Sequence, residues 1–154
     1  MSRRPRIGDI IEIPLPTGNA YAQFTHKHPQ YGALIRVLKS IYPEIPAKLG
    51  ELLIDEPLFI TFFPLGAAIN RNVVKVVSNV DVPDHSKQFP IFKAGVPNAQ
   101  GKVETWWLWD GENETRVDSL SEEQKDYPVR GVINDTLLVE RISSQWRHRD
   151  AVSE

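Results

Sequence analysis

The chain has 154 residues, a length typical of one domain, and 41% of them are hydrophobic, which is enough to form a buried core. Its 18 basic and 20 acidic residues give a net charge of −2, so the composition lacks the basic excess expected of a nucleic-acid-binding domain. The chain contains no cysteine, which excludes disulfides, thiolate catalysis and zinc sites built on cysteine.

The N-terminal region carries one basic cluster, Arg3, Arg4 and Arg6, which we interpret as a solvated terminus. Gly8 and Asp9 interrupt the apolar residues that follow, and this is not the pattern of a signal peptide. We therefore expect a cytoplasmic protein.

The most apolar stretch, residues 58–65, is far shorter than the ~20 residues that a membrane-spanning helix needs. We expect a single domain over residues 1–154, with frayed ends at 1–6 and 150–154.

The first half of the chain predicts five strands, at 7–15, 20–25, 31–38, 58–63 and 73–77. Ile11, Ile13 and Leu15 alternate with other residues, as in a half-buried strand. Pro14 has no N–H for a strand ladder and favours an edge or exit position. The continuous apolar run at 58–63 is typical of a strand buried on both faces.

Proline and glycine mark the connections between these strands. Residues 16–19 and 28–30 predict turns, 40–50 predict a loop or short irregular helix, and 64–72 predict a turn of helix. Residues 81–101 are rich in proline and glycine and predict irregular structure, either a functional loop or a linker, without indicating its role.

Three tryptophans dominate the strand predicted at 103–110, which ends at the turn signal Asp110-Gly111. The period of two places Trp107 and Trp109 on one face, and Trp106 and Leu108 on the other. Such aromatic side chains form either a packed core or a binding hot spot.

The C-terminal part predicts a capping box at Ser121 and Gln124, with a short helix that ends before Pro128. A last strand is predicted at 129–133. A helix is then predicted from an N-cap at Asp135.

Leu138, Ile142 and Trp146 are four residues apart and share one face of this last helix. Arg147, His148 and Arg149 suit the negative end of its dipole. The elements together predict a mainly β α+β fold: a strongly bent antiparallel sheet, or an SH3-like barrel, with a C-terminal helix.

The sequence shows no serine-nucleophile or phosphate-loop motif. His26 and His28 could hold a metal only with further ligands, and we interpret them as surface residues at the end of a hairpin. We expect no catalytic residue, no metal and no cofactor. A hydrolase that uses these histidines with carboxylates is an alternative hypothesis, and it predicts bound metal.

Two groups of motifs resemble the immunity protein 26 family of bacterial polymorphic toxin systems. The N-terminal group is Ile7-Gly8-Asp9-Ile10-Ile11-Glu12-Ile13-Pro14-Leu15, then Gly18 and Tyr21-Ala22-Gln23. The C-terminal group is Trp106-Trp107-Leu108-Trp109-Asp110-Gly111, Leu120-Ser121-Glu122-Glu123, Tyr127-Pro128 and Leu137-Leu138-Val139-Glu140-Arg141-Ile142. The resemblance implies a cytoplasmic, β-rich, non-catalytic protein that binds a cognate toxin. The matched residues then look structural: Gly8 frees the backbone, Pro14 ends a strand, and the tryptophans pack.

We therefore predict an immunity protein that neutralises a toxin domain by occluding its active surface. The candidate partner-binding residues are Asp9, Glu12, Tyr21, Trp106 and Glu112. Asp81, Asp84 and Glu114 extend the set of acidic surface residues that would complement a basic toxin. The alternative hypothesis is a small nucleic-acid- or ligand-binding β-barrel module, and the charge balance disfavours nucleic acid.

Overall fold

The computed structural model describes residues 4–152, which divide into two units. Unit 1 contains residues 4–88 and 131–146, and unit 2 contains residues 89–130 and 147–152. The single domain over 1–154 stays a prediction, and residues 1–3 and 153–154 of the predicted frayed ends lie outside the described residues. No helix in the described part of the chain is long and apolar enough to cross a membrane.

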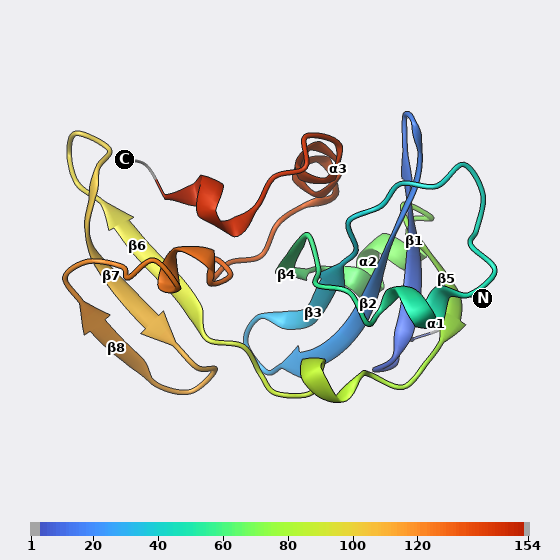
Figure 1. Cartoon of the computed structure of the whole chain (residues 1–154), viewed down its shortest axis with the longest axis horizontal. Helices are drawn as coiled ribbons and strands as arrows, with labels where there is room; N and C mark the ends of the chain where they lie inside the picture. The colour runs from blue at the N-terminus through green and yellow to red at the C-terminus, as the bar shows by residue number, and fades with distance from the viewer. Residues whose placement is uncertain (1–3, 153–154) are drawn as a thin grey trace. The chain divides into compact units, whose positions relative to one another are not determined.

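Unit 1 contains an antiparallel sheet of five strands in the order β4-β3-β2-β1-β5 (Figure 1). The strands are β1 (Asp9–Leu15), β2 (Gly18–His28), β3 (Gly32–Val37), β4 (Phe59–Phe63) and β5 (Lys75–Asn79). All five predicted strands are confirmed, with ends that differ by a few residues. The sheet is open because β4 and β5 form its edges, and the predicted mainly β α+β class is confirmed.

The two ends of β1 show the structural roles of Gly8 and Pro14. Gly8 has a φ of +97°, and a Cβ at this position would lie 2.8 Å from the carbonyl oxygen of Val80, so only glycine fits without strain. Strand β1 lies between β2 and β5, but its end at Pro14 has the edge or exit position that the sequence predicted. Strand β5 pairs with β1 only up to Glu12, so Pro14 lies beyond the point where its missing N–H would break that ladder.

Both faces of the five-stranded sheet are covered, as the apolar run at 58–63 predicted. One face buries Ile11 and Phe59 in a cluster with residues of α2 (Leu65–Asn70) and α3 (Asp135–Ser143). The opposite face buries Ile10 and Tyr21 with Leu49, the first residue of α1 (Leu49–Leu52). The helix predicted at 64–72 is therefore present as α2, whereas 40–48 form a loop, the other structure predicted for 40–50, and α1 begins only at Leu49. The two helices cover opposite faces of the sheet.

The boundaries of α3 differ from the prediction at both ends. Asn134, one residue before the predicted cap, is the N-cap, because its Oδ1 accepts the N–H of Leu137 at 2.8 Å. The helix ends at Ser143, so the interpretation of Arg147, His148 and Arg149 as its C-terminal charges is wrong.

The predicted apolar face of α3 is confirmed for Leu138 and Ile142, which are both fully buried. Trp146 follows the helix, and its indole lies edge-on to Phe59 with ring centroids 5.6 Å apart. Arg141 covers the same indole, with Cζ 3.9 Å from the ring centroid.

Unit 2 contains a second antiparallel sheet, ordered β6-β7-β8. Its strands are β6 (Phe92–Pro97), β7 (Val103–Trp109) and β8 (Glu114–Val117). The prediction of irregular structure across 81–101 is wrong for β6, which pairs with β7, and for the short 3-10 helix η1 (Asp84–Ser86) of unit 1. The strand predicted at 129–133 is also wrong, because Val129 and Val132 form only isolated bridges.

Two 3-10 turns complete unit 2. The predicted capping box is confirmed: the N–H of Ser121 donates to Gln124 Oε1 at 2.9 Å, and the N–H of Gln124 donates to Ser121 Oγ at 3.2 Å. The turn η2 (Gln124–Asp126) follows. The turn η3 (His148–Ala151) is closed by Asp150, whose carboxylate accepts the N–H of Arg147 at 2.8 Å.

Candidate protein-binding surface

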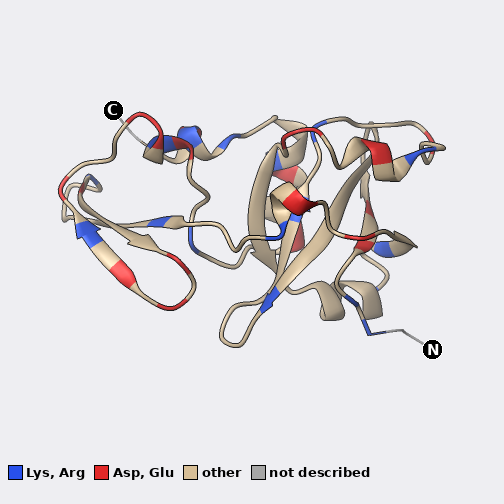
Figure 2. Cartoon of the chain, turned by 60° about the horizontal axis from the view of Figure 1, so that its bottom comes forward, with Lys and Arg blue, Asp and Glu red and all other residues tan. Residues whose placement is uncertain are grey.

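Residues 103–118 of unit 2 form a hairpin in which β7 pairs with β8. We call it the acidic hairpin, because it carries five carboxylates and a single basic residue, Arg116. The carboxylates are all exposed and belong to Glu104, Asp110, Glu112, Glu114 and Asp118. Figure 2 shows these charges along the strands and the tip of the hairpin.

The tip of the hairpin is held in one conformation by Asp110. Its Oδ1 accepts the backbone N–H of Glu112 at 3.0 Å and of Asn113 at 2.8 Å. These hydrogen bonds, first that from Asn113 and then that from Glu112, lower the pKa of the Asp110 carboxyl below its usual value. The carboxylate is therefore ionised and fixed in position at neutral pH.

Trp109 anchors the end of the hairpin next to its tip, where it is paired with Glu114. It is buried, and its ring contacts Phe89 edge-on at 5.7 Å and Phe92 at 5.4 Å, both between centroids. The guanidinium of Arg130 lies 5.6 Å from the centroid of the same ring, and Nη1 of Arg130 donates to Glu114 at 2.8 Å. This tryptophan is structural.

Trp106 and Trp107 are only half-buried, and they point to opposite faces of β7. Trp106 lies against Gly95 of β6, where a Cβ would come within 2.9 Å of its ring. Glycine at position 95 therefore leaves the space that the Trp106 indole occupies. Neither the Trp106 nor the Trp107 indole N–H donates to another described residue, so both can donate to a partner.

Lys93 of β6 supports the sheet from within unit 2. It is fully buried, and its Nζ donates to the carbonyl oxygens of Lys125 and of His148, the latter at 2.7 Å. Burial lowers the pKa of Lys93 to about 8. Arg149 adds a hydrogen bond to Asp126 at 3.0 Å, so η2 and η3 are linked to each other and to β6. These hydrogen bonds therefore hold the strand β6, with which the hairpin is paired, in a fixed position within unit 2.

Of the five predicted partner-binding residues, Trp106 and Glu112 lie in the acidic hairpin, while Asp9, Glu12 and Tyr21 lie in unit 1. Asp9 is fully buried; its carboxylate accepts the N–H of Arg6 at 2.8 Å and the Nδ2–H of Asn79 at 2.9 Å. The prediction that Asp9 is a surface residue is therefore wrong.

Tyr21 is also fully buried, so it cannot present its ring to a partner as predicted. Its hydroxyl donates to Glu12 at 3.1 Å, and Glu12 lies 3.6 Å from the Nζ of Lys75. Burial, followed by the hydrogen bond to Glu12, raises the pKa of Tyr21 to about 12. With only 12% of its side chain exposed, Glu12 serves this internal contact, which corrects its placement at the surface.

The other acidic candidates remain at the surface. Asp81, Asp84 and Glu114 are exposed, and Asp84 pairs with Lys87 at 2.9 Å. Glu114 belongs to the acidic hairpin, whereas Asp81 and Asp84 belong to unit 1.

His26 and His28 both have hydrogen-bond partners within unit 1. His26 contacts Thr25 Oγ1 at 2.9 Å and, through Nε2, the carbonyl oxygen of Lys87 at 2.7 Å. His28 is buried, so its interpretation as a surface residue is wrong, and its Nδ1 accepts the N–H of Gln30 at 3.1 Å. Within residues 4–152, no three His, Cys, Asp or Glu side chains come together as a metal site would require.

Sequence reasoning missed Trp107 and Glu104 as members of the surface, together with the whole of β8. The signal for Trp107 was its alternation with Trp106. Strand β8 has only four residues, three of them polar, and gives little periodicity to detect. No protein-family model, curated protein or solved structure matches the chain. The function of the acidic hairpin must therefore follow from its own geometry.

Proposed function

We propose that this chain is an immunity protein that binds and neutralises a cognate bacterial toxin domain in the cytoplasm, using the acidic hairpin as its contact surface. The observation that supports the proposal is the pair of half-buried tryptophans, Trp106 and Trp107, on a strand bordered by exposed carboxylates. Interface hot spots are enriched in tryptophan and are surrounded by polar residues.

The charge of the hairpin favours a basic partner. The hairpin has five exposed carboxylates and only one basic residue, Arg116. This excess of negative charge attracts cationic surfaces and repels the phosphates of nucleic acid. Glu114 is partly neutralised by Arg130, whereas Glu104, Glu112 and Asp118 have no ion-pair partner among the described residues. These three would provide most of the electrostatic complementarity.

The preformed tip favours inhibition by occlusion. Because hydrogen bonds already fix Asp110, binding would order little additional backbone, and less conformational entropy would be lost. The resemblance to the immunity protein 26 family supports the choice of a toxin as the partner, while the choice of the acidic hairpin rests on its exposed charges and tryptophans.

The first test is genetic. We expect a neighbouring gene to encode a large secreted protein with a toxin-like C-terminal domain. Expression of that domain alone should arrest growth, and co-expression of the full-length chain should restore it. Growth arrest that persists despite co-expression contradicts the proposal.

The second test is the salt dependence of binding to that toxin domain. A variant with Glu104→Gln, Glu112→Gln and Asp118→Asn should bind more weakly and with a smaller salt dependence than the wild type. Glu44→Gln with Glu51→Gln, both in unit 1, is the control for lost surface charge. Unchanged affinity and salt dependence in the hairpin variant would refute the proposal that the hairpin carboxylates attract the toxin. Retention of the chain on nucleic acid would favour the alternative module.

A further inference from the structure

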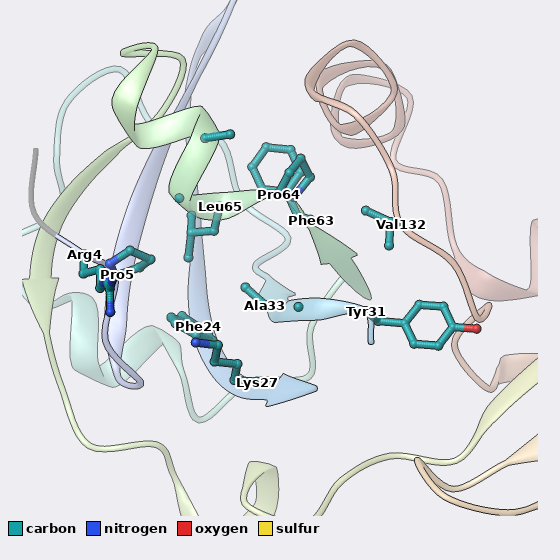
Figure 3. Close-up of a pocket in the computed structure, with 13 residues that line it drawn as sticks. Arg4, Pro5, Phe24, Lys27, Tyr31, Ala33, Phe63, Pro64, Leu65 and Val132 are labelled. Carbon is teal, nitrogen blue, oxygen red and sulfur yellow. The ribbon is translucent and has the colours of Figure 1, made fainter. Parts of the chain in front are cut away.

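Unit 1 contains a pocket of about 370 Å³ beside the turn that joins β2 and β3 (Figure 3). It is formed by β2, β3 and β4, by the start of α2, by Val132 and by the N-terminal residues Arg4 and Pro5. The volume lies within the range of small-molecule pockets. Nothing in the proposed function uses it.

The aromatic wall of the pocket is preformed. Tyr31 stacks on Phe62 with centroids 5.1 Å apart and planes 27° apart, and it contacts His28 at 5.4 Å. The N–H of Tyr31 also donates to His28 Nδ1 at 3.3 Å. Phe24 and Phe63, both buried, supply further apolar surface. A ligand would therefore meet a wall whose rings are already in place.

Small residues leave the space of the pocket open. Gly32 and Ala33 of β3, and Gly66 and Ala67 of α2, all line it. A Cβ built at Gly32 or at Gly66 would meet no other atom within 4 Å. Val132, on the aromatic side, is 52% exposed although it is apolar. The apolar surface is therefore accessible from solvent.

The charged residues of the pocket lie on one side of it. Its two charged lining residues, Arg4 and Lys27, are both basic and exposed, and no carboxylate lines it. In Figure 3 they lie on the side of the pocket opposite Tyr31 and Val132. Neither cation has an ion-pair partner among residues 4–152. One end of the pocket is therefore cationic and the other aromatic.

We propose that this pocket binds a small amphipathic carboxylate, with its apolar body between Phe63, Leu65 and Tyr31 and its carboxylate at Lys27 and Arg4. Burial of the body would provide most of the binding free energy. The charge-assisted contact to Lys27 would fix the orientation. A neutral ligand of the same shape would leave both cations unneutralised, and an anion without an apolar body would leave the aromatic wall exposed.

The probe for this proposal is octanoate, titrated into the isotope-labelled full-length chain and followed by amide chemical shifts. We expect saturable shifts at Gly32, Gly66 and Ala67. Octanamide, which has a similar body without the charge, should bind about tenfold more weakly. Acetate, which has the charge without the body, should give no saturable shift. Equal affinity for octanoate and octanamide, or shifts spread away from these residues, would overturn the proposal.

Two variants assign the binding to the pocket. Lys27→Gln should weaken octanoate binding about tenfold and leave octanamide binding unchanged. Lys48→Gln removes an exposed lysine outside the pocket and should change neither.

Gly66→Leu extends a side chain from α2 into the open space and should abolish binding. Leucine is also the better helix former at this position, so the fold should be retained. Amide shifts of β1 and β5 that match the wild type would verify the fold. Wild-type octanoate binding by either Gly66→Leu or Lys27→Gln would refute the proposed site.

Discussion

The sheets of the two units use similar residues in opposite ways. In unit 1, Tyr21, Asp9 and Glu12 form contacts inside a five-stranded sheet that is covered on both faces. In unit 2, Trp106 of the three-stranded sheet is only half-buried, and Glu112 at the tip of its hairpin is exposed. The difference follows from what covers each sheet, since the side chains themselves are equally aromatic or acidic. Aromatic and acidic residues on a strand therefore indicate a binding surface only where no other element packs over them.

The largest expected effect is the difference in unfolding free energy between removing a buried aromatic residue and removing a half-buried one. Phe59→Ala removes a fully buried ring of unit 1 and should lower the free energy of unfolding by about 3–5 kcal/mol. Trp107→Ala in unit 2 should lower it by about 1 kcal/mol, because its ring is already partly hydrated. Chemical denaturation of both variants provides the measurement. Equal losses would show that Trp107 is a core residue.

The next effect concerns Lys93, the buried charge of unit 2. Its pKa is about 8 in the folded chain and 10.5 as the ordinary value, so between these pH values the unfolded chain binds a proton that the folded chain does not. Stability should therefore rise from pH 8 to pH 10.5, by at most about 3 kcal/mol.

Lys93→Met, which keeps a long side chain without the charge, isolates this contribution. The difference between the unfolding free energies of wild type and variant should change in this pH window and be constant below it. A difference that stays constant across the whole pH range would show that Lys93 has the same pKa in the folded and the unfolded chain.

A smaller effect tests the corrected role of Asp9. Asp9→Ala leaves the N–H of Arg6 without its side-chain acceptor and removes one of the two acceptors of the Asn79 amide, so it should destabilise unit 1 by about 1–3 kcal/mol. Glu112→Gln, at the exposed tip of the acidic hairpin, should leave stability unchanged. The loss of stability in the Asp9→Ala variant is measured by hydrogen exchange of the β1 amides, and the β7 amides serve as the internal control. Unchanged exchange of β1 would mean that Asp9 contributes no structural contact.

The sequence allowed the strands of unit 1 to be predicted because alternating or continuous apolar runs follow directly from burial on one face or on both. It did not place β6, since Gly95 and Pro97 are residues that usually indicate a loop. Nor did it place Asp9, because the burial of a carboxylate depends on donors such as Asn79 that are distant in the sequence. In the binding surface, the period of two assigned Trp106 and Trp107 to opposite faces, whereas their exposure depended on the packing of unit 2.

The affinity of the neighbouring toxin domain for the Trp107→Ala variant tests the central proposal most directly. Isothermal titration should give a dissociation constant at least ~30-fold weaker than that of the wild type, because the loss of a hot-spot tryptophan costs about 2 kcal/mol or more. Trp146→Ala, which removes a half-buried tryptophan of unit 1, is the matched control and should bind as the wild type does. Wild-type affinity of the Trp107→Ala variant would contradict the assignment of the acidic hairpin as the toxin-binding surface.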